Sequence, residues 1–93
     1  NAAHMAEFGH LYHVCLCDGE PAGYVRSKEG DISVVTHPDF QRRGIGLFMI
    51  EGIMDEFPNS HALVKIDNIA SLKLFESCGF EKRFYILKRP DQN

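Results

Sequence analysis

The sequence predicts a single α/β domain in which helices flank one mixed, mostly antiparallel sheet. Three observations predict this fold class. Runs of β-prone residues separated by turn residues fill the first third of the chain, two segments with helical features follow, and each of these is followed by a further β-prone run. The expected order is therefore strand, strand, strand, helix, strand, helix, strand.

The first three strands are expected to form an antiparallel meander. Residues 11–17, LYHVCLC, end at the turn dipeptide Asp18-Gly19, after which residues 21–26, PAGYVR, resume an extended pattern. The turn SKEG leads into residues 31–37, DISVVTH, a β-branched run that stops at a proline. Two turns between three β-prone runs predict two consecutive hairpins.

A helix with one buried stripe is predicted after residue 44. Apolar or small residues recur there at spacings of three and four, at Ile45, Phe48, Met49, Gly52 and Ile53. The helix is expected to end at the Pro-Asn pair that follows. A strand, this helix and the next strand would then form a right-handed crossover between two parallel strands.

The remaining segments predict a strand, a second helix and a last strand. Residues 61–66, HALVKI, form a short apolar run suited to a central strand. The dipeptide DN can cap a helix over residues 69–78, and Gly79 can end it. Residues 80–89, FEKRFYILKR, alternate basic and apolar residues, which is typical of a strand at a sheet edge.

Length and charge limit what the chain can be. Its 93 residues suffice for one domain, and we interpret residues 1–4, NAAH, as a cloning scar before a domain over residues 5–93. The net charge of -3 argues against a general affinity for nucleic acid or an anionic membrane. No apolar run approaches the roughly 18 residues of a membrane span, and no signal pattern opens the chain, so we expect a cytoplasmic protein.

The three cysteines are expected to be reduced thiols, since their count is odd and Cys15 and Cys17 lie only two residues apart. Together with His10 and His13 these two form the pattern H-x-x-H-x-C-x-C, which raises the possibility of zinc. On an extended strand, however, His13, Cys15 and Cys17 would be spaced at about 7 Å intervals, too far apart for one tetrahedral centre. We therefore expect no metal.

The most concentrated positive charge lies in QRRGIG, residues 41–46, at the turn from a strand into a helix. The start of a helix presents unpaired N–H groups and the positive end of the dipole, and glycines allow a phosphate to approach the backbone. Two arginines add donors and charge. The pattern indicates a phosphate site, although glycines at a tight turn and solvated arginines would also account for it.

Two segments together resemble the GNAT superfamily of acyl-CoA N-acyltransferases. These are VVTHPDFQRRGIG and, one helix and one strand later, DNIASLKLFESCGF. The family signature is Gln or Arg, two residues, Gly, one residue, then Gly or Ala, and residues 41–46 meet it in full. The resemblance covers roughly residues 11–88 and implies acetyl-CoA as co-substrate and transfer of its acetyl group to an amine.

The resemblance also implies a role for individual residues. The backbone of the loop and its arginines would hold the pyrophosphate, the end of the third predicted strand would offer backbone groups to the pantetheine arm, and the second helix would approach the arm from the other side. The implied cofactor-binding residues are Val34, Val35, Thr36, Gln41, Arg42, Arg43, Gly44, Ile45, Gly46, Asn68, Ser71 and Phe75. Asn68 would serve equally well as a helix cap.

The catalytic acid and base are not identified by the sequence. Phe75 stands where many family members carry a tyrosine whose hydroxyl can protonate the departing thiolate, and Tyr85 or Tyr24 could substitute for it. The CoA thiol is acidic enough to leave without strong help, so Phe75 weakens this mechanism without forbidding transfer. Asp31 and His37 are candidates for the general base. Each also has a structural explanation, as a turn residue and as the residue before a proline.

The chain is shorter than a typical family domain, which begins with a strand and two helices before the segment LYHVCLC. Only about ten residues precede that segment here. A second copy could complete the acceptor site, so we expect a homodimer. The alternative to an enzyme is a reduced module of the same fold that binds CoA, or only a protein partner, without catalysis.

Overall fold

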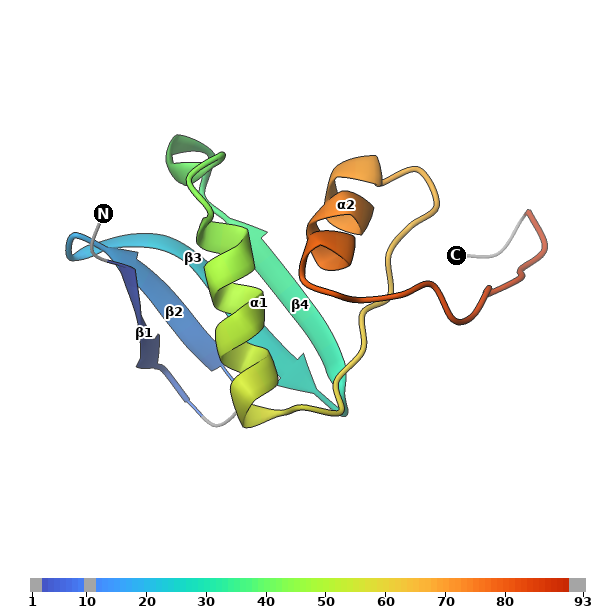
Figure 1. The fold of residues 1–93 in the computed structure, drawn as a ribbon, viewed down its shortest axis with the longest axis horizontal. Helices are drawn as coiled ribbons and strands as arrows, with labels where there is room; N and C mark the ends of the chain where they lie inside the picture. The colour runs from blue at the N-terminus through green and yellow to red at the C-terminus, as the bar shows by residue number, and fades with distance from the viewer. Residues whose placement is uncertain (1–2, 10–11, 91–93) are drawn as a thin grey trace.

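The structure is a computed structural model that describes residues 3–9 and 12–90. Its elements are four strands, β1 (Ala3–Glu7), β2 (Tyr12–Cys17), β3 (Glu20–Lys28) and β4 (Asp31–Thr36), a short 3-10 helix η1 (Pro38–Phe40), and the helices α1 (Ile45–Glu56) and α2 (Ile69–Ser77). The strands form one sheet in the order β1-β2-β3-β4, and every neighbouring pair is antiparallel. The predicted fold class, helices packed on a mostly antiparallel sheet, is confirmed (Figure 1), and the pairing of the four strands is antiparallel throughout.

The two predicted hairpin turns are present. Asp18 and Gly19 both have positive φ, at 52° and 83°, and so do Glu29 and Gly30, at 53° and 81°. Two successive residues of positive φ are the requirement of the tight turn whose twist matches that of antiparallel strands. The glycine in each pair adopts this conformation without steric cost.

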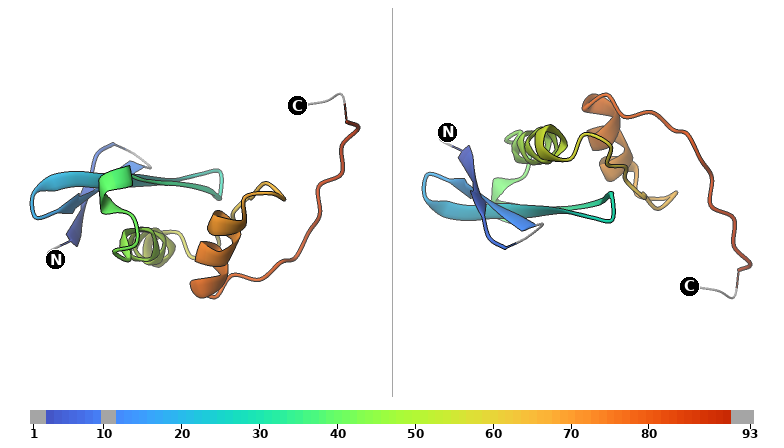
Figure 2. Two further views of the ribbon diagram at one scale, coloured as in Figure 1. Left: turned by 90° about the horizontal axis from the view of Figure 1, so that it is seen from above. Right: turned by 90° about the horizontal axis from the view of Figure 1, so that it is seen from below.

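Helix α1 covers one face of the sheet, and α2 packs beside it (Figure 2). Alternate residues of β2 are buried, which identifies the face under the helix. Ile45, Met49 and Ile53 of the predicted stripe are buried against this face. Ile50 is buried with them, whereas Phe48, which was predicted in the stripe, is 37% exposed. The buried apolar core consists of Cys15, Cys17, Ala22, Val25, Ile32, Ile45, Met49, Ile50, Ile53 and Phe75.

The prediction of strands over residues 61–66 and 80–89 is wrong. The first segment makes one parallel bridge, between Asp31 and His61, and then leaves the sheet. The second contains no strand and is exposed throughout residues 81–89. A strand is stable only when it pairs, and because residues 62–66 diverge from β4 they offer the later segment no edge to pair with. The predicted parallel crossover is accordingly reduced to a single bridge.

The N-terminal residues form a strand that was not expected. β1 starts at Ala3, within the four residues interpreted as a cloning scar, and Ala3 and Met5 pack partly against the core. Backbone pairing with β2 accounts for this, since hydrogen bonds between strands place few demands on sequence. Two residues named in the sequence predictions, His10 of the H-x-x-H pattern and Leu11 at the start of the first expected strand, lie outside the described residues. No helix in the described part of the chain is long and apolar enough to cross a membrane.

Candidate functional site

The N-terminus of α1 is open to solvent and has no capping side chain. Gly44 is the residue that caps it, with φ 75° and ψ 12°, and a Cβ there would meet no atom within 4 Å. In the first backbone hydrogen bond of the helix, the Phe48 N–H donates to the Gly44 carbonyl at 3.0 Å. The N–H groups of residues 45–47 therefore have no acceptor inside the helix and point outward, as an anion site requires.

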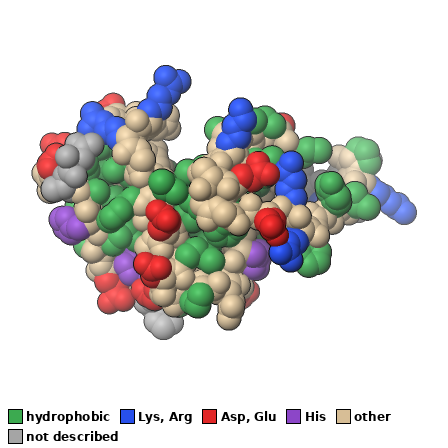
Figure 3. All heavy atoms as spheres, viewed as in Figure 1, with side chains coloured by type: hydrophobic (Ala, Val, Ile, Leu, Met, Phe, Trp, Pro, Cys, Tyr) green, Lys and Arg blue, Asp and Glu red, His purple; other side chains and the backbone are tan. Residues whose placement is uncertain are grey.

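The loop before α1 adds positive charge to this end. Residues 41–44 are all exposed, and Arg42 has a left-handed φ of 64°. The Arg43 guanidinium lies 5.1 Å from the ring centroid of Phe40, which holds its planar group over the aromatic face. No carboxylate in the described residues forms an ion pair with either arginine. Figure 3 shows the surface hollowed between the η1 loop and α2, with Lys or Arg side chains on both sides.

The outer edge of β4 adjoins this loop and is largely unpaired. The Ile32 N–H donates to the His61 carbonyl at 2.9 Å, and pairing on this edge ends there within the described chain. Because backbone direction alternates along a strand, Val34 and Thr36 also direct their N–H and carbonyl groups to this edge. The backbone N–H and carbonyl groups of Val35 point toward β3 instead. Only its side chain, which is 45% exposed, is free to contact a ligand at this edge.

Helix α2 places its predicted residues in two different environments. The Asn68 side chain accepts a hydrogen bond from the Ser71 N–H at 3.1 Å, so Asn68 is the N-cap of the helix and Ser71 contributes its backbone to that cap. Phe75, near the other end of the helix, is only 6% exposed. Its ring packs edge-on against the ring of Phe80, with the two ring centroids 5.1 Å apart. Asn68 is thus accessible for a ligand, whereas the Phe75 ring belongs to the core and carries no hydroxyl.

The candidate acid and base residues are not brought together. Asp31 and His37 lie at opposite ends of β4, which at about 3.3 Å per residue places them roughly 20 Å apart. His37 lies beside the loop, but its Nδ1 accepts the Asp39 N–H at 3.1 Å, so in the neutral ring the proton is on Nε2 and no lone pair is free. Tyr85 is 90% exposed in the segment after α2, and Tyr24 stacks on Tyr12 at 5.2 Å.

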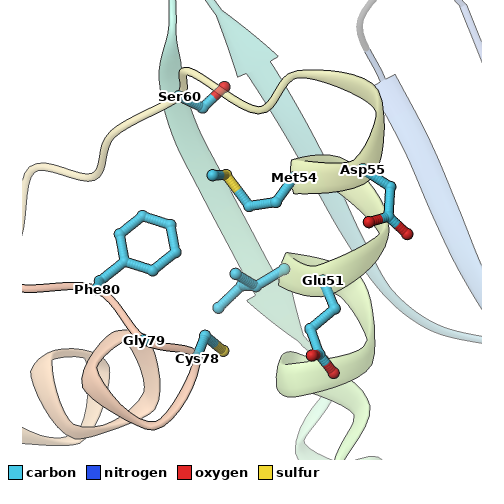
Figure 4. Close-up of a pocket in the computed structure, with 8 residues that line it drawn as sticks. Glu51, Met54, Asp55, Ser60, Cys78, Gly79 and Phe80 are labelled. Atoms are coloured by element: carbon cyan, nitrogen blue, oxygen red, sulfur yellow. The ribbon is translucent and has the colours of Figure 1, made fainter.

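A pocket of about 340 Å³ lies between the middle of α1 and the end of α2 (Figure 4). Met54, Ser60, Cys78 and Phe80 are among its lining residues, and no residue of the 41–46 loop is. Burial raises the pKa of the Cys78 thiol above its ordinary value of 9.0, and Glu51 raises it further, against a hydrogen bond with Ser77. The thiol is therefore mostly protonated near neutral pH, which makes it a poor nucleophile.

The sequence matches the Acetyltransferase (GNAT) family over residues 2–80, which include the loop, β4 and α2. The chain belongs to this family. GNAT membership agrees with the open helix N-terminus beside an unpaired strand edge, because the family signature falls on that loop.

Individual GNAT relatives are similar to this chain over part of their length. The chain is 34% identical over 55 residues to the [ribosomal protein bS18]-alanine N-acetyltransferase of Salmonella typhimurium, and the match covers 54% of this chain and 37% of that protein. It therefore spans little more than a third of the curated relative that it matches.

Two solved GNAT structures share the fold. AAC(6')-Iy, in complex with the bisubstrate analogue CoA-S-monomethyl-acetylneamine, superposes with a TM-score of 0.70 at 16% identity, over 88% of this chain and 69% of the other. The ribosomal-protein-S18-alanine N-acetyltransferase of Escherichia coli has a TM-score of 0.67 at 24% identity, over 80% and 54% of the two chains. At these identities the likeness concerns the fold alone.

Two residues beside the GNAT signature loop were missed by sequence reasoning. Phe40 supports the Arg43 guanidinium, and Leu74 packs against Gly46 at the start of α1. The signal for Phe40 was an aromatic residue three positions before an arginine. The sequence gives no signal for Leu74 beyond its place on the apolar side of a helix, because Gly46, which it contacts, belongs to another helix.

Proposed function

We propose that this chain binds acetyl-CoA and transfers its acetyl group to an amine. The observation that carries the proposal is the uncapped N-terminus of α1 next to the unpaired edge of β4. One is suited to a pyrophosphate and the other to an extended arm that contains amides. The bisubstrate analogue bound to AAC(6')-Iy contains CoA, and the relative from Salmonella is named as an N-acetyltransferase, which supports the same chemistry.

The proposed binding mode assigns the pyrophosphate to the backbone N–H groups of residues 42–46, with Arg42 and Arg43 nearby. The pantetheine arm would run along β4 and bond to the outward backbone groups of Val34 and Thr36. Asn68 would reach the arm from α2. In this arrangement the arm would pair with the part of the β4 edge that residues 62–66 leave unpaired.

The proposed reaction is direct attack of the amine nitrogen on the thioester carbonyl. The new C–N bond forms, the C–S bond breaks, the amine loses one proton and the thiolate of CoA gains one. Neither Phe75 nor His37 is placed to handle these protons, since one has no ionisable group and the other has its lone pair engaged. We propose that the amine attacks in its neutral form and that solvent exchanges the protons.

Thermal unfolding with and without acetyl-CoA tests the binding step. Ligand at 100 times its dissociation constant should stabilise the protein by about 2.7 kcal/mol. Arg42→Glu and Arg43→Glu should each reduce this effect through charge repulsion with the phosphates. Arg26→Glu, an exposed position on β3, is the matched control and should keep it. Equal stabilisation of all four proteins would contradict the proposed phosphate site.

The alternative is a module that binds CoA without transfer, and the lack of a placed acid or base favours it. Release of CoA thiol with a panel of amines separates the two. Product with any amine supports the enzyme. Tight binding without product across a peptide N-terminus, a lysine, an amino sugar and small amines supports the module.

We also propose that the chain forms a homodimer. Several apolar side chains after β4 are largely exposed, and a second copy of the chain would bury them. They are Leu63, Ile66, Ile69, Phe84, Tyr85, Ile86 and Leu87. Light scattering at micromolar concentration should give twice the monomer mass, and Phe84→Lys with Leu87→Lys should return it to one. A monomer in the parent protein would contradict this proposal.

A further inference from the structure

Three side chains able to bind a metal meet at the C-terminal end of α1. They are Glu7 of β1, His13 of β2 and Glu56 of α1, and one ligand atom from each lies within 4.8 Å of the others. Glu7 is paired directly with His13 in the sheet, which places both side chains on the same face. The cluster is remote from the 41–46 loop, since the 12 residues of α1 separate them by about 17 Å.

The contact between His13 and Glu56 already has a spacing suited to a shared ion. His13 Nε2 lies 3.3 Å from Glu56 Oε2. Two ligand atoms bound tetrahedrally to one zinc ion at about 2.05 Å lie roughly 3.4 Å apart. The ligand atom of Glu7, an exposed side chain, lies within 4.8 Å of the other two.

Charge and burial also favour a cation at this cluster. Two carboxylates converge on one imidazole, and no Lys or Arg in the described chain forms an ion pair with either of them. His13 is only 8% exposed, and its Nε2 is the ring nitrogen that faces Glu56. A divalent cation would neutralise the carboxylates and fix the orientation of the ring.

We propose that Glu7, His13 and Glu56 bind a divalent cation of the zinc type. One imidazole nitrogen and two carboxylate oxygens form a mixed donor set suited to zinc, with water completing the coordination. The ligands come from three elements, so the ion would tie the edge strand β1 to the end of α1. Neighbouring elements bring these ligands together, whereas His13, Cys15 and Cys17 are spread along a single strand.

Titration with Zn²⁺ tests the site through thermal unfolding in chelator-treated protein. The parent should gain several degrees at saturating metal, whereas Glu7→Gln and Glu56→Gln should bind at least about tenfold more weakly. Glu51→Gln, an exposed residue on the same helix, is the matched control and should behave as the parent does. Glu7 carries the test because it is exposed and its replacement leaves the core intact.

Two results would overturn the proposal. One is no stabilisation of the parent by Zn²⁺, and the other is equal stabilisation of the parent, Glu7→Gln and Glu56→Gln. Substitution with Co²⁺ examines the nearby thiols, because a thiolate ligand adds a charge-transfer absorption that carboxylates and imidazole do not. We expect none, and its presence would assign the metal to cysteine instead. The acetyl-CoA response of Glu7→Gln should equal that of the parent, so the two proposals fail independently.

Discussion

Gly46 of α1 lies directly against Leu74 of α2. A Cβ at position 46 would be 2.8 Å from Leu74 Cδ2 and 3.4 Å from Cδ1. The last glycine of the signature therefore allows the two helices to pack closely, in addition to any approach of a phosphate to the backbone. Helix packing and the candidate ligand site are linked at this residue.

Gly46→Ala should destabilise the protein by about 1 kcal/mol. Overpacking costs roughly 1–3 kcal/mol, and the higher helix propensity of alanine returns up to about 1 kcal/mol. In a Leu74→Ala background the same change should be neutral or stabilising, because the conflict is removed. Urea unfolding of the four proteins gives the coupling, and an identical effect in both backgrounds would contradict the contact.

Asn68→Ala should lower the free energy of unfolding by about 1 kcal/mol, because the Ser71 N–H loses its acceptor. Asn68→Ser should preserve most of that stability, since serine also caps helices. If Asn68 also bonds to the pantetheine arm, as we propose, the serine variant should still bind acetyl-CoA more weakly, by about fivefold to tenfold. If this folded variant binds acetyl-CoA with unchanged affinity, Asn68 acts only as the helix cap.

Phe75→Tyr should not raise the rate of CoA thiol release. The added hydroxyl would enter the core beside Phe80, and burial without a partner should cost about 1–3 kcal/mol of stability. Thiol-release assays and urea unfolding measure the two effects. A faster reaction would show instead that the ring reaches the departing sulfur.

Cys15 should resist alkylation until the protein unfolds. It is fully buried, and burial raises the pKa of its thiol above 9.0, with Cys17 raising it further. Cys78 is half-buried and its pKa is raised as well, so it should react before Cys15 but more slowly than a free thiol. Mass spectrometry after iodoacetamide treatment at pH 8 measures this order, and early modification of Cys15 would contradict it.

The raised pKa of Cys15 also predicts a loss of stability at high pH. The unfolded thiol loses its proton near pH 9 while the folded one retains it, so between the two pKa values the folded state binds more protons. This contribution to stability is complete below about pH 9 and is lost as the pH rises toward the folded pKa. Cys15→Ala should show a shallower decline between pH 8 and pH 10.5 in urea unfolding, and an unchanged slope would contradict the shift.

The loop of the candidate site was predictable because its signals are local. The turn at Gly30 connects β3 to β4, the apolar spacing after Gly44 marks the start of α1, and Asn68 caps α2 as expected. Each depends on residues within a few positions of one another. The chain runs from the end of β4 directly into this loop and then into α1. The open edge of β4 therefore lies beside the loop.

The sequence by itself determined the hairpins, the two helices and the place of the signature loop, because turn conformation, caps and periodicity are decided over short stretches of chain. Only the tertiary structure decided that residues 62–66 and 80–89 remain unpaired, since a strand needs an edge to pair with. It alone placed Leu74 against Gly46 and brought Glu7 and Glu56 to His13. Contacts between distant residues depend on how the elements pack, and no local pattern encodes them.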